Sequence, residues 1–269
     1  MKYFTKKAGI STIILHHIDR SSFFLFEKLI RKLDDELGFI RPNDLDLFFR
    51  GEKIIHGKKL LLTFDDGFES NYYLAKEILD PLDIKGLFFV NPNFSKLTKK
   101  FEQKKFMKNN FLFKDNNRNN LENINNPEIL PMSFSNMRKL INSGHTIGSH
   151  TLNHKRLSKL KSNKELFSEI VGSKRILENK LLCEINHFAF PFGDIDSISI
   201  QGMEMAKKYY KYIYSGIRGL NTINVKKYAI RRESLNISNN MNYNLLLSNN
   251  AISFKDRKAR IKLDNLTIH

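Results

Sequence analysis

The sequence predicts a parallel α/β fold whose functional site lies at the carboxyl ends of the strands. Short apolar runs alternate with segments of helical periodicity, which is the pattern of successive βαβ units. Two polar motifs directly follow apolar runs, an Asp-Asp pair at 65–66 and a His-x-x-x-His pair at 150–154. Because parallel strands open on the same edge, we expect the two motifs to meet there.

The predicted elements of the first half surround the Asp-Asp pair. Gly38 and Pro81 each end a segment of helical periodicity. The apolar runs before and after these segments are short enough to be strands. We expect strands at 11–17, 59–64 and 87–90, and helices at 22–37 and 69–79.

The second half continues the alternation. Ser162 and Glu165 form a capping-box pattern at the start of a long helix. We expect helices at 135–143, 162–177 and 197–210, and strands at 145–148, 187–190, 212–215 and 228–231.

Two segments look irregular. Residues 95–131 are rich in Lys and Asn and too long for a simple connector, so we predict a lid or substrate loop, with a disordered insertion as the alternative. Residues 236–269 are Asn-rich and then basic, which indicates a solvated tail or a contact with an acidic partner. We expect one domain over 1–269 with its motif-bearing core at 58–235.

The chain is strongly basic. Its 269 residues include 45 Lys and Arg against 28 Asp and Glu, a net charge of +17. Such a balance suggests a polyanionic partner such as nucleic acid, an anionic membrane surface or an acidic glycan. A general bias towards Lys, Asn and Ile is the alternative explanation. No cluster of aromatic residues interleaved with arginine stands out, so nucleic acid is not the expected partner.

Cys183 is the single cysteine, so no intramolecular disulfide forms and the fold does not depend on an oxidising compartment. No apolar run has the length of a signal-peptide core or a transmembrane helix. We expect a cytoplasmic protein, with peripheral membrane contact as an alternative.

Asp65 and Asp66 lie where a strand ends. Neighbouring carboxylates raise one another's pKa unless a cation or hydrogen-bond donors compensate, so the pair suggests a metal ligand beside a base. An ordinary Asp-Asp-Gly turn is the alternative, since Asp and Gly are common turn residues.

His150 and His154 are four residues apart, one helical turn, where both imidazoles can face the same ion. A solvated or hydrogen-bonded pair is the alternative. With one aspartate they form a three-ligand set, which leaves coordination positions open for water and substrate, as in a catalytic site.

Three ordered motifs resemble those of a known family. Thr63-Phe64-Asp65-Asp66-Gly67, His150-Thr151-Leu152-Asn153-His154 and Phe188-Ala189-Phe190-Pro191-Phe192-Gly193 are similar in order and spacing to the leading motifs of polysaccharide deacetylases, carbohydrate esterase family 4. The resemblance covers roughly 58–235, with 11–20 as a candidate extension. It implies a distorted (β/α) barrel with fewer than eight complete βα units.

The resemblance also implies the chemical roles. Asp66, His150 and His154 are the implied metal ligands, and Asp65 is the implied general base that takes a proton from the attacking water. The backbone N–H of Phe192 is the implied donor to the tetrahedral oxyanion. Zinc is the first choice of metal, and other first-row divalent ions fit the same ligands.

The sequence departs from the family pattern at two places. Many members carry an arginine where this chain has Ala189, so another cation must orient the base; Arg232 is the preferred substitute and Arg231 the alternative. The late Leu-x-His motif that often supplies the general acid is missing, which leaves His17 as a candidate.

These residues suggest a metal-dependent hydrolase that removes the N-acetyl group from an N-acetylated sugar of a glycan or glycan precursor. Hydrolysis of another non-peptide amide is the alternative within the class. A catalytically weakened protein that binds a glycan or polyanion is the alternative outside it.

Overall fold

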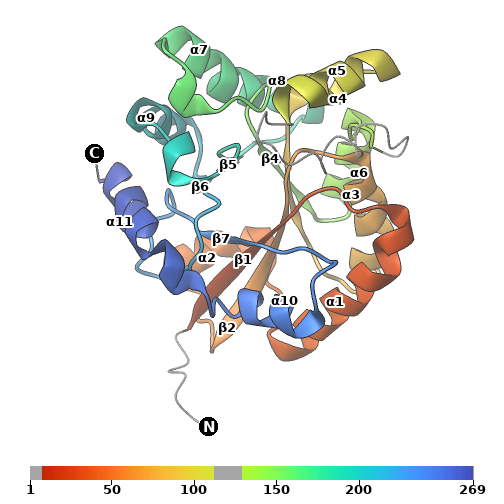
Figure 1. Cartoon of the computed structure of the whole chain (residues 1–269), viewed down its shortest axis with the longest axis vertical. Helices are drawn as coiled ribbons and strands as arrows, with labels where there is room; N and C mark the ends of the chain where they lie inside the picture. Colours follow the sequence, from red (N-terminus) through yellow and green to blue (C-terminus); the bar gives the residue numbers. More distant parts are fainter. Residues whose placement is uncertain (1–7, 112–128, 269) are drawn as a thin grey trace.

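The strands form a parallel sheet that curls into a barrel. The computed structural model describes residues 8–111 and 129–268, and within these ranges seven strands pair in the order β6-β5-β4-β3-β2-β1-β7, all parallel (Figure 1). Their bounds are β1 Gly9–Leu15, β2 Lys58–Phe64, β3 Leu87–Val90, β4 Thr146–Ser149, β5 His187–Ala189, β6 Tyr212–Tyr214 and β7 Arg232–Ser234.

The two edges of this sheet approach each other through a single bridge. Ile230 pairs with Tyr214 of β6, donating its N–H to the Ile213 carbonyl at 3.0 Å and accepting from the Ser215 N–H at 2.9 Å. Two residues later the chain enters β7, which pairs with β1. The barrel is therefore nearly closed with fewer than eight βα units, which confirms the predicted fold class.

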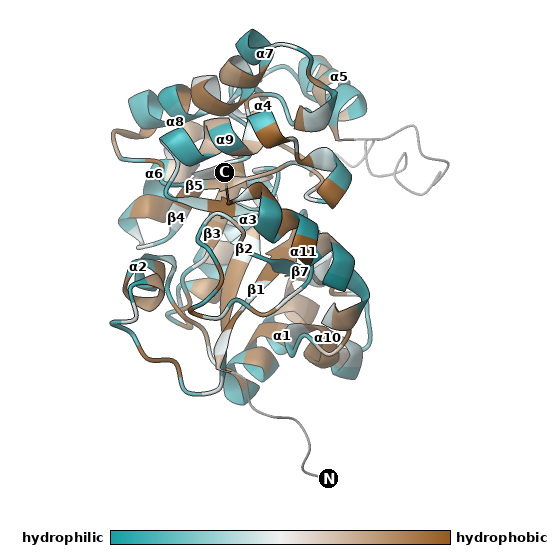
Figure 2. Ribbon diagram, turned by 90° about the vertical axis from the view of Figure 1, so that its left-hand side faces the viewer, coloured by the Kyte–Doolittle hydropathy of each residue, from teal (hydrophilic) through white to brown (hydrophobic). Residues whose placement is uncertain are grey.

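The strands are buried on both faces, as their continuous apolar runs predict. Leu61, Phe89 and Tyr214 belong to a cluster separate from the main core, whereas Leu62 and Phe88 pack in the main core. This alternation follows from the period of two in a strand. Apolar strands accordingly occupy the middle of the molecule, with more polar helix surfaces outside (Figure 2).

Helices surround the strands. The longest, α1, is amphipathic and buries five apolar residues, of which Phe26 packs against Phe64 of β2. The helices are α1 Phe23–Glu36, α2 Leu45–Phe49, α3 Glu69–Leu74, α4 Pro92–Ser95, α5 Lys100–Asn110, α6 Phe134–Asn142, α7 Asn163–Phe167, α8 Ser173–Leu181, α9 Ile200–Tyr209, α10 Met241–Ser248 and α11 Arg257–Leu266. Two π turns, Ala75–Leu79 and Ser168–Gly172, continue α3 and join α7 to α8, and short 3-10 helices lie at Arg20–Ser22, Pro42–Asp44, Leu157–Lys159, Ile195–Ser197 and Ser253–Asp256.

The predicted capping box starts α7. The Ser162 hydroxyl accepts from the Glu165 N–H at 3.2 Å, and the Ser162 N–H donates to the Glu165 carboxylate at 3.2 Å. The helix expected at 162–177 is therefore present, but its middle turn is a π turn that the periodicity did not reveal.

Both segments that look irregular in the sequence contain helices. Residues 100–110 form α5, while 112–128 of the predicted lid lie outside the described residues. The expected solvated tail instead folds as α10 and α11, where Leu247 and Leu263 are buried, and α10 lies beside α1 (Figure 1). The sequence of 236–269 did not reveal these helices, because its many asparagines and lysines outnumber the few apolar residues that are buried. The late strand also lies at 232–234 rather than 228–231.

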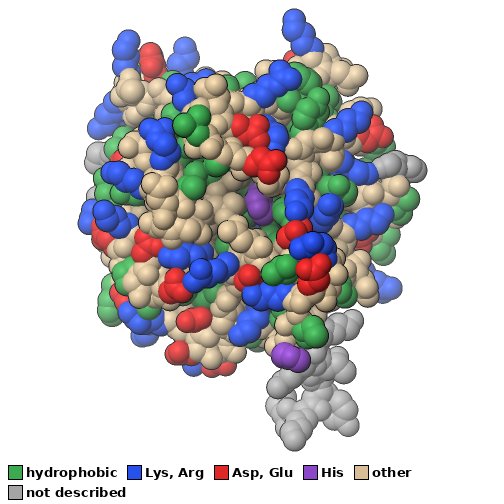
Figure 3. All heavy atoms as spheres, turned by 180° about the vertical axis from the view of Figure 1, so that it is seen from behind, with side chains coloured by type: hydrophobic (Ala, Val, Ile, Leu, Met, Phe, Trp, Pro, Cys, Tyr) green, Lys and Arg blue, Asp and Glu red, His purple; other side chains and the backbone are tan. Residues whose placement is uncertain are grey.

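The excess of positive charge is spread out. On the face opposite to that of Figure 1, Lys and Arg side chains are distributed over the whole surface with Asp and Glu between them (Figure 3). On this face the distribution favours a general compositional bias over a dedicated polyanion site. Within the described ranges, no helix combines the length and apolarity that crossing a membrane requires.

Candidate metal centre

A sharp turn after β2 delivers two carboxylates to one cavity. Asp65 N–H donates to the Leu15 carbonyl at 2.9 Å, and Asp66 and Gly67 follow with φ of 75° and 71°. Consecutive residues of an extended chain would point to opposite faces, and the left-handed turn removes that constraint. A Cβ on Gly67 would lie 3.0 Å from the Val90 side chain, so both the backbone angle and the available space favour glycine.

The two histidines follow β4 in an irregular loop, not on the helical turn that their spacing suggested. His150 continues the ladder by donating its N–H to the Val90 carbonyl at 3.0 Å. Thr151 and His154 then adopt left-handed φ angles of 64° and 58°. These two reversals bring the imidazoles together, with ring centroids 5.0 Å apart.

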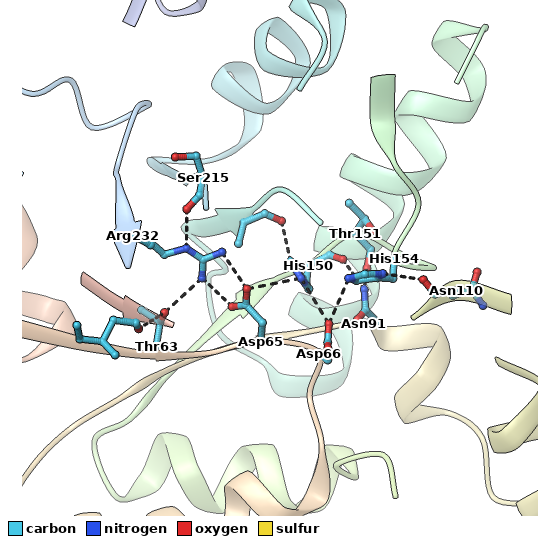
Figure 4. Close-up of polar contacts among 12 residues, drawn as sticks. Thr63, Asp65, Asp66, Asn91, Asn110, His150, Thr151, His154, Ser215 and Arg232 are labelled. Carbon is cyan, nitrogen blue, oxygen red and sulfur yellow. Dashed lines mark hydrogen bonds and ion pairs between the residues drawn. The ribbon is translucent and has the colours of Figure 1, made fainter. Parts of the chain in front are cut away.

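Each imidazole is oriented by a backbone carbonyl. His150 Nδ1 lies 2.9 Å from the Ala189 oxygen, and His154 Nδ1 lies 2.9 Å from the Asn110 oxygen at the end of α5 (Figure 4). A carbonyl only accepts, so both Nδ1 atoms carry the proton. Both Nε2 atoms therefore present a lone pair, which is the form in which histidine binds a metal.

Three ligand atoms converge at the centre of the site. Asp66 Oδ1 lies 3.2 Å from His154 Nε2 and 3.6 Å from His150 Nε2, and one ligand atom from each residue lies within 4.8 Å of the others. All three side chains are buried, and Asp66 Oδ1 accepts no hydrogen bond of normal geometry from the described residues. Lone pairs facing a carboxylate repel unless a cation lies between them. The separations fit ligands about 2.0–2.2 Å from one ion, as in zinc sites.

The protonation states suit this arrangement. Burial lowers the pKa of His150 to about 4, so its imidazole is neutral near pH 7. Burial would raise the pKa of Asp66, but the neighbouring histidines, His154 above all, hold it below its ordinary value. Near neutral pH the site therefore offers an ionised carboxylate and a neutral imidazole without first releasing a proton.

The neighbouring Asp65 forms a buried ion pair with Arg232. Arg232 Nη1 and Nη2 donate to its two oxygens at 2.7 and 2.9 Å, and both residues are almost fully buried. Burial alone would raise the pKa of Asp65, but the Arg232 guanidinium and His150 together lower it. Arg232 is itself fixed, because its Nε donates to the Ser215 carbonyl at 2.8 Å and its Nη1 to Thr63 Oγ1 at 3.3 Å.

Arg231 is not part of this centre. Its guanidinium binds both oxygens of Asp264 on α11, at 2.9 and 2.7 Å. Of the two arginines that the sequence offered beside the aspartate, the structure brings only Arg232 to it.

These groups line a cavity of about 280 Å³. Phe192 and Phe111 flank the His154 ring, with centroid distances of 4.6 and 4.9 Å. Phe192 has a φ of 67°, and the following Gly193 packs so tightly that a Cβ would lie 2.3 Å from the Gly216 nitrogen. The lining residues are Ile14, His16, Asp65, Asp66, Phe111, His150, His154, Phe192, Gly216, Arg232 and Ser234.

The sequence model of the polysaccharide deacetylase family matches residues 53–210, more than half of the chain. The chain belongs to this family. It is accordingly an enzyme of the class that hydrolyses carbon–nitrogen bonds other than peptide bonds. No curated protein sequence matches this polysaccharide deacetylase.

Solved structures share the fold of this polysaccharide deacetylase at low sequence identity. The Streptococcus pyogenes deacetylase PplD, in complex with acetate, is 17% identical with a TM-score of 0.68, over 89% of this chain and 98% of that one. IcaB from Ammonifex degensii is 17% identical with a TM-score of 0.65, over 90% and 98%. A de-N-acetylase from Aggregatibacter actinomycetemcomitans is 13% identical with a TM-score of 0.66, over 89% and 98%.

The histidine that reaches the cavity of this polysaccharide deacetylase is His16, not His17. His17 is turned away: Nδ1 contacts Ser70 Oγ at 2.8 Å and Nε2 contacts Asp19 Oδ1 at 2.9 Å. The register of β1 on β2 explains the difference. Ile14 is in register with Thr63, so two residues further His16 lies beside Asp65 on the same face. Combined with the parallel pairing, the alternation of side chains was the signal that could have identified it.

Proposed function

We propose that this chain is a metal-dependent hydrolase that removes the N-acetyl group from an N-acetylated sugar of a glycan or glycan precursor. The observation that carries the proposal is the convergence of Asp66, His150 and His154 beside a buried Asp65–Arg232 pair, in a chain of this family. The activity is assigned to a single domain spanning 1–269.

Asp66 and the Nε2 atoms of His150 and His154 hold the metal. Zinc is the preferred ion because imidazole and carboxylate ligands suit it, and other first-row divalent ions are compatible. When bound, the ion lowers the pKa of a water and polarises the substrate carbonyl. Because Nδ1 of each histidine is tied to a carbonyl, the ligands are oriented before the ion arrives.

Asp65 acts as the general base. Its carboxylate lines the cavity beside the ligands, with Oδ2 3.8 Å from His150 Nε2, and can accept the proton of the attacking water. Arg232 takes the place of the family arginine that Ala189 replaces. Its paired hydrogen bonds keep Asp65 ionised and fix the plane of the carboxylate.

Phe192 supplies a backbone N–H to the oxyanion. It lies at the cavity wall in the rigid turn before Gly193, and Arg156 covers its ring with the guanidinium carbon 4.8 Å from the centroid. A donor held this way needs little reorganisation as charge develops on the substrate oxygen.

His16 is the candidate proton donor to the leaving amine, replacing His17 in that role. It lies on the cavity wall directly after the end of β1, where the parallel register of β1 and β2 brings it beside Asp65.

The test begins with metal content. We expect about one ion per chain in the wild type and little in His154→Ala, with acetate released from a panel of N-acetylated sugars and suppressed by chelator. Metal without acetate release would point to a different amide as substrate. Absence of metal from the wild type would overturn the proposal in favour of a binding protein.

A further inference from the structure

A buried carboxylate outside the cavity holds the loop between the two histidines. Glu169 lies in the π turn Ser168–Gly172, between α7 and α8, and is 6% exposed. Its Oε2 accepts from the Asn153 backbone N–H at 2.8 Å and its Oε1 from Asn153 Nδ2 at 2.7 Å. The Glu169 carbonyl also accepts from the Leu152 N–H at 2.9 Å. One residue therefore satisfies three donors of the loop.

The other side of the loop is held by asparagines that follow β3. Asn93 Nδ2 donates to Asn153 Oδ1 at 2.8 Å, and the Asn93 N–H donates to the Leu152 carbonyl at 3.3 Å. Asn91 Nδ2 donates to the Thr151 carbonyl at 3.1 Å. Asn153 is thus clamped between Glu169 and Asn93.

This loop needs such support. Thr151 and His154 both occupy the left-handed region, which is unfavourable for residues other than glycine and persists only where the surroundings enforce it. Asn153 directly precedes His154, so its position sets the direction in which the His154 imidazole leaves the backbone.

Burial of Glu169 has no other explanation in the described part of the chain. None of the ion pairs between described residues includes Glu169, and it does not line the cavity. A buried carboxylate is retained at a cost unless hydrogen bonds satisfy it, and here both oxygens serve Asn153. The π turn that carries Glu169 is also a rare element that concentrates at functional sites.

We propose that Glu169 is a positioning residue of the metal centre, which fixes Asn153 and thereby aims the Nε2 atom of His154 at the shared ion. The inference rests on the proposed metal site. It adds to that site an anchor on a separate helical segment, sixteen positions from Asn153.

A charge-exchange pair of variants tests this geometry. Asn153→Asp places a carboxylate against the Glu169 carboxylate and removes the donor of one hydrogen bond. Adding Glu169→Gln restores the side-chain hydrogen bond with its direction reversed. The amide N–H of residue 169 then donates to the carboxylate of residue 153, while the amide oxygen still accepts from the backbone N–H of residue 153. Asn153→Ala removes the side-chain bond without adding charge.

The readouts are Zn²⁺ affinity by competition with a chromophoric chelator and the visible spectrum of the Co²⁺-substituted protein. We expect Asn153→Asp to weaken affinity by about 10- to 100-fold, as outer partners of ligands do, and to alter the Co²⁺ spectrum. The double variant should recover most of the affinity and the wild-type spectrum. Melting of the metal-free proteins shows whether each variant folds.

The outcomes separate the two proposals. If the wild type binds no metal, the proposed function fails first. If the wild type binds metal and Asn153→Asp binds it equally well, the positioning role is wrong while the metal site stands. Should Asn153→Asp not fold, unchanged affinity and Co²⁺ spectrum in Asn153→Ala overturn the positioning role. Loss without recovery in a folded double variant also contradicts it.

Discussion

His145 and His150 stand at opposite ends of β4, and each faces an aspartate that comes from another part of the chain. Near the amino end, His145 Nε2 lies 3.1 Å from Asp80 Oδ1. Beyond the carboxyl end, His150 Nε2 lies 3.6 Å from Asp66 Oδ1. Both histidines are buried, but the two pairs differ in which ring nitrogen remains available to a metal.

The difference lies in which ring nitrogen is tied to the backbone. His145 Nδ1 accepts from the Gly86 N–H at 3.0 Å, so its Nε2 carries the proton and donates to Asp80, which also binds Lys85 at 2.8 Å. His150 Nδ1 instead faces a carbonyl, which leaves a lone pair on Nε2. The backbone group at Nδ1 therefore decides whether a histidine–aspartate pair can bind a metal. An N–H at Nδ1 leaves the proton on Nε2, whereas a carbonyl at Nδ1 leaves the Nε2 lone pair available.

The largest expected effect is the difference between substitutions at the two ends of β4. His150→Ala should weaken metal binding more than about 100-fold and abolish turnover, because one of three protein ligands is lost from a binding free energy of about 10 kcal/mol. His145→Ala should leave metal affinity and turnover of the folded protein unchanged, and reduce the free energy of unfolding by about 1–3 kcal/mol.

Metal titration, acetate release and urea unfolding of both variants measure this contrast. Loss of metal in His145→Ala, or retention of metal in His150→Ala, would show that the tautomer argument is wrong.

Asp65→Asn tests the site beyond the carboxyl end of β4, because it removes the proposed base and keeps the three proposed metal ligands. Turnover should fall by about 10²- to 10⁴-fold, the usual contribution of a general base, while metal content remains that of the wild type. Atomic absorption and steady-state kinetics on the same sample provide the measurement. Full activity in this variant would remove Asp65 from the mechanism.

The two adjacent arginines give a matched comparison of buried and accessible ion pairs. Arg232→Met leaves the buried Asp65 without its partner and should cost about 3–5 kcal/mol of unfolding free energy, together with turnover. Arg231→Met breaks a pair with Asp264, whose side chain is 44% exposed, and should cost about 1 kcal/mol or less. Equal losses in chemical denaturation would contradict the assignment.

The smallest effect concerns pH. His187 lies at the amino end of β5, and burial lowers its pKa to about 3 from an ordinary value near 6.5. The folded state therefore resists protonation: its stability contribution is complete above pH 6.5 and declines as pH falls from 6.5 towards 3. One such group gives a loss of about 1.4 kcal/mol per pH unit, about 2 kcal/mol between pH 6.5 and 5.

Urea unfolding in chelator at pH 7.5, 6.5 and 5 checks this dependence. His187→Gln should flatten it, whereas His56→Gln, at an exposed position, should not. An unchanged slope in His187→Gln would show that another group is responsible.

The sequence was sufficient for the features that are local. Apolar runs and turn residues predicted β2, β3 and the helices α1, α6 and α9, and the Asp-Asp and His-x-x-x-His motifs identified the residues that the structure brings together. The capping box at Ser162 was also readable, because its two partners are three positions apart.

Features that depend on distant pairing were not readable. The strand expected at 228–231 begins at Arg232, because pairing with β1 rather than propensity decides its bounds. His16 was passed over for His17 because the choice depends on the register of β1 against β2. The helical interpretation of His150 and His154 failed for a related reason, since Glu169 and the asparagines after β3 hold the loop in another conformation.

The bridge between Ile230 and Tyr214 bears on the order in which the parts of the site come together during folding. The proposed metal ligands lie between positions 66 and 154, but Arg232 is 167 positions from Asp65 and reaches it only when the final strand docks. Pairings of such high contact order form late in folding. On a ribosome, the ligands would thus be synthesised long before the cation that holds the proposed base ionised. Hydrolytic competence would come with barrel closure, so a chain released early could carry metal without being an active enzyme.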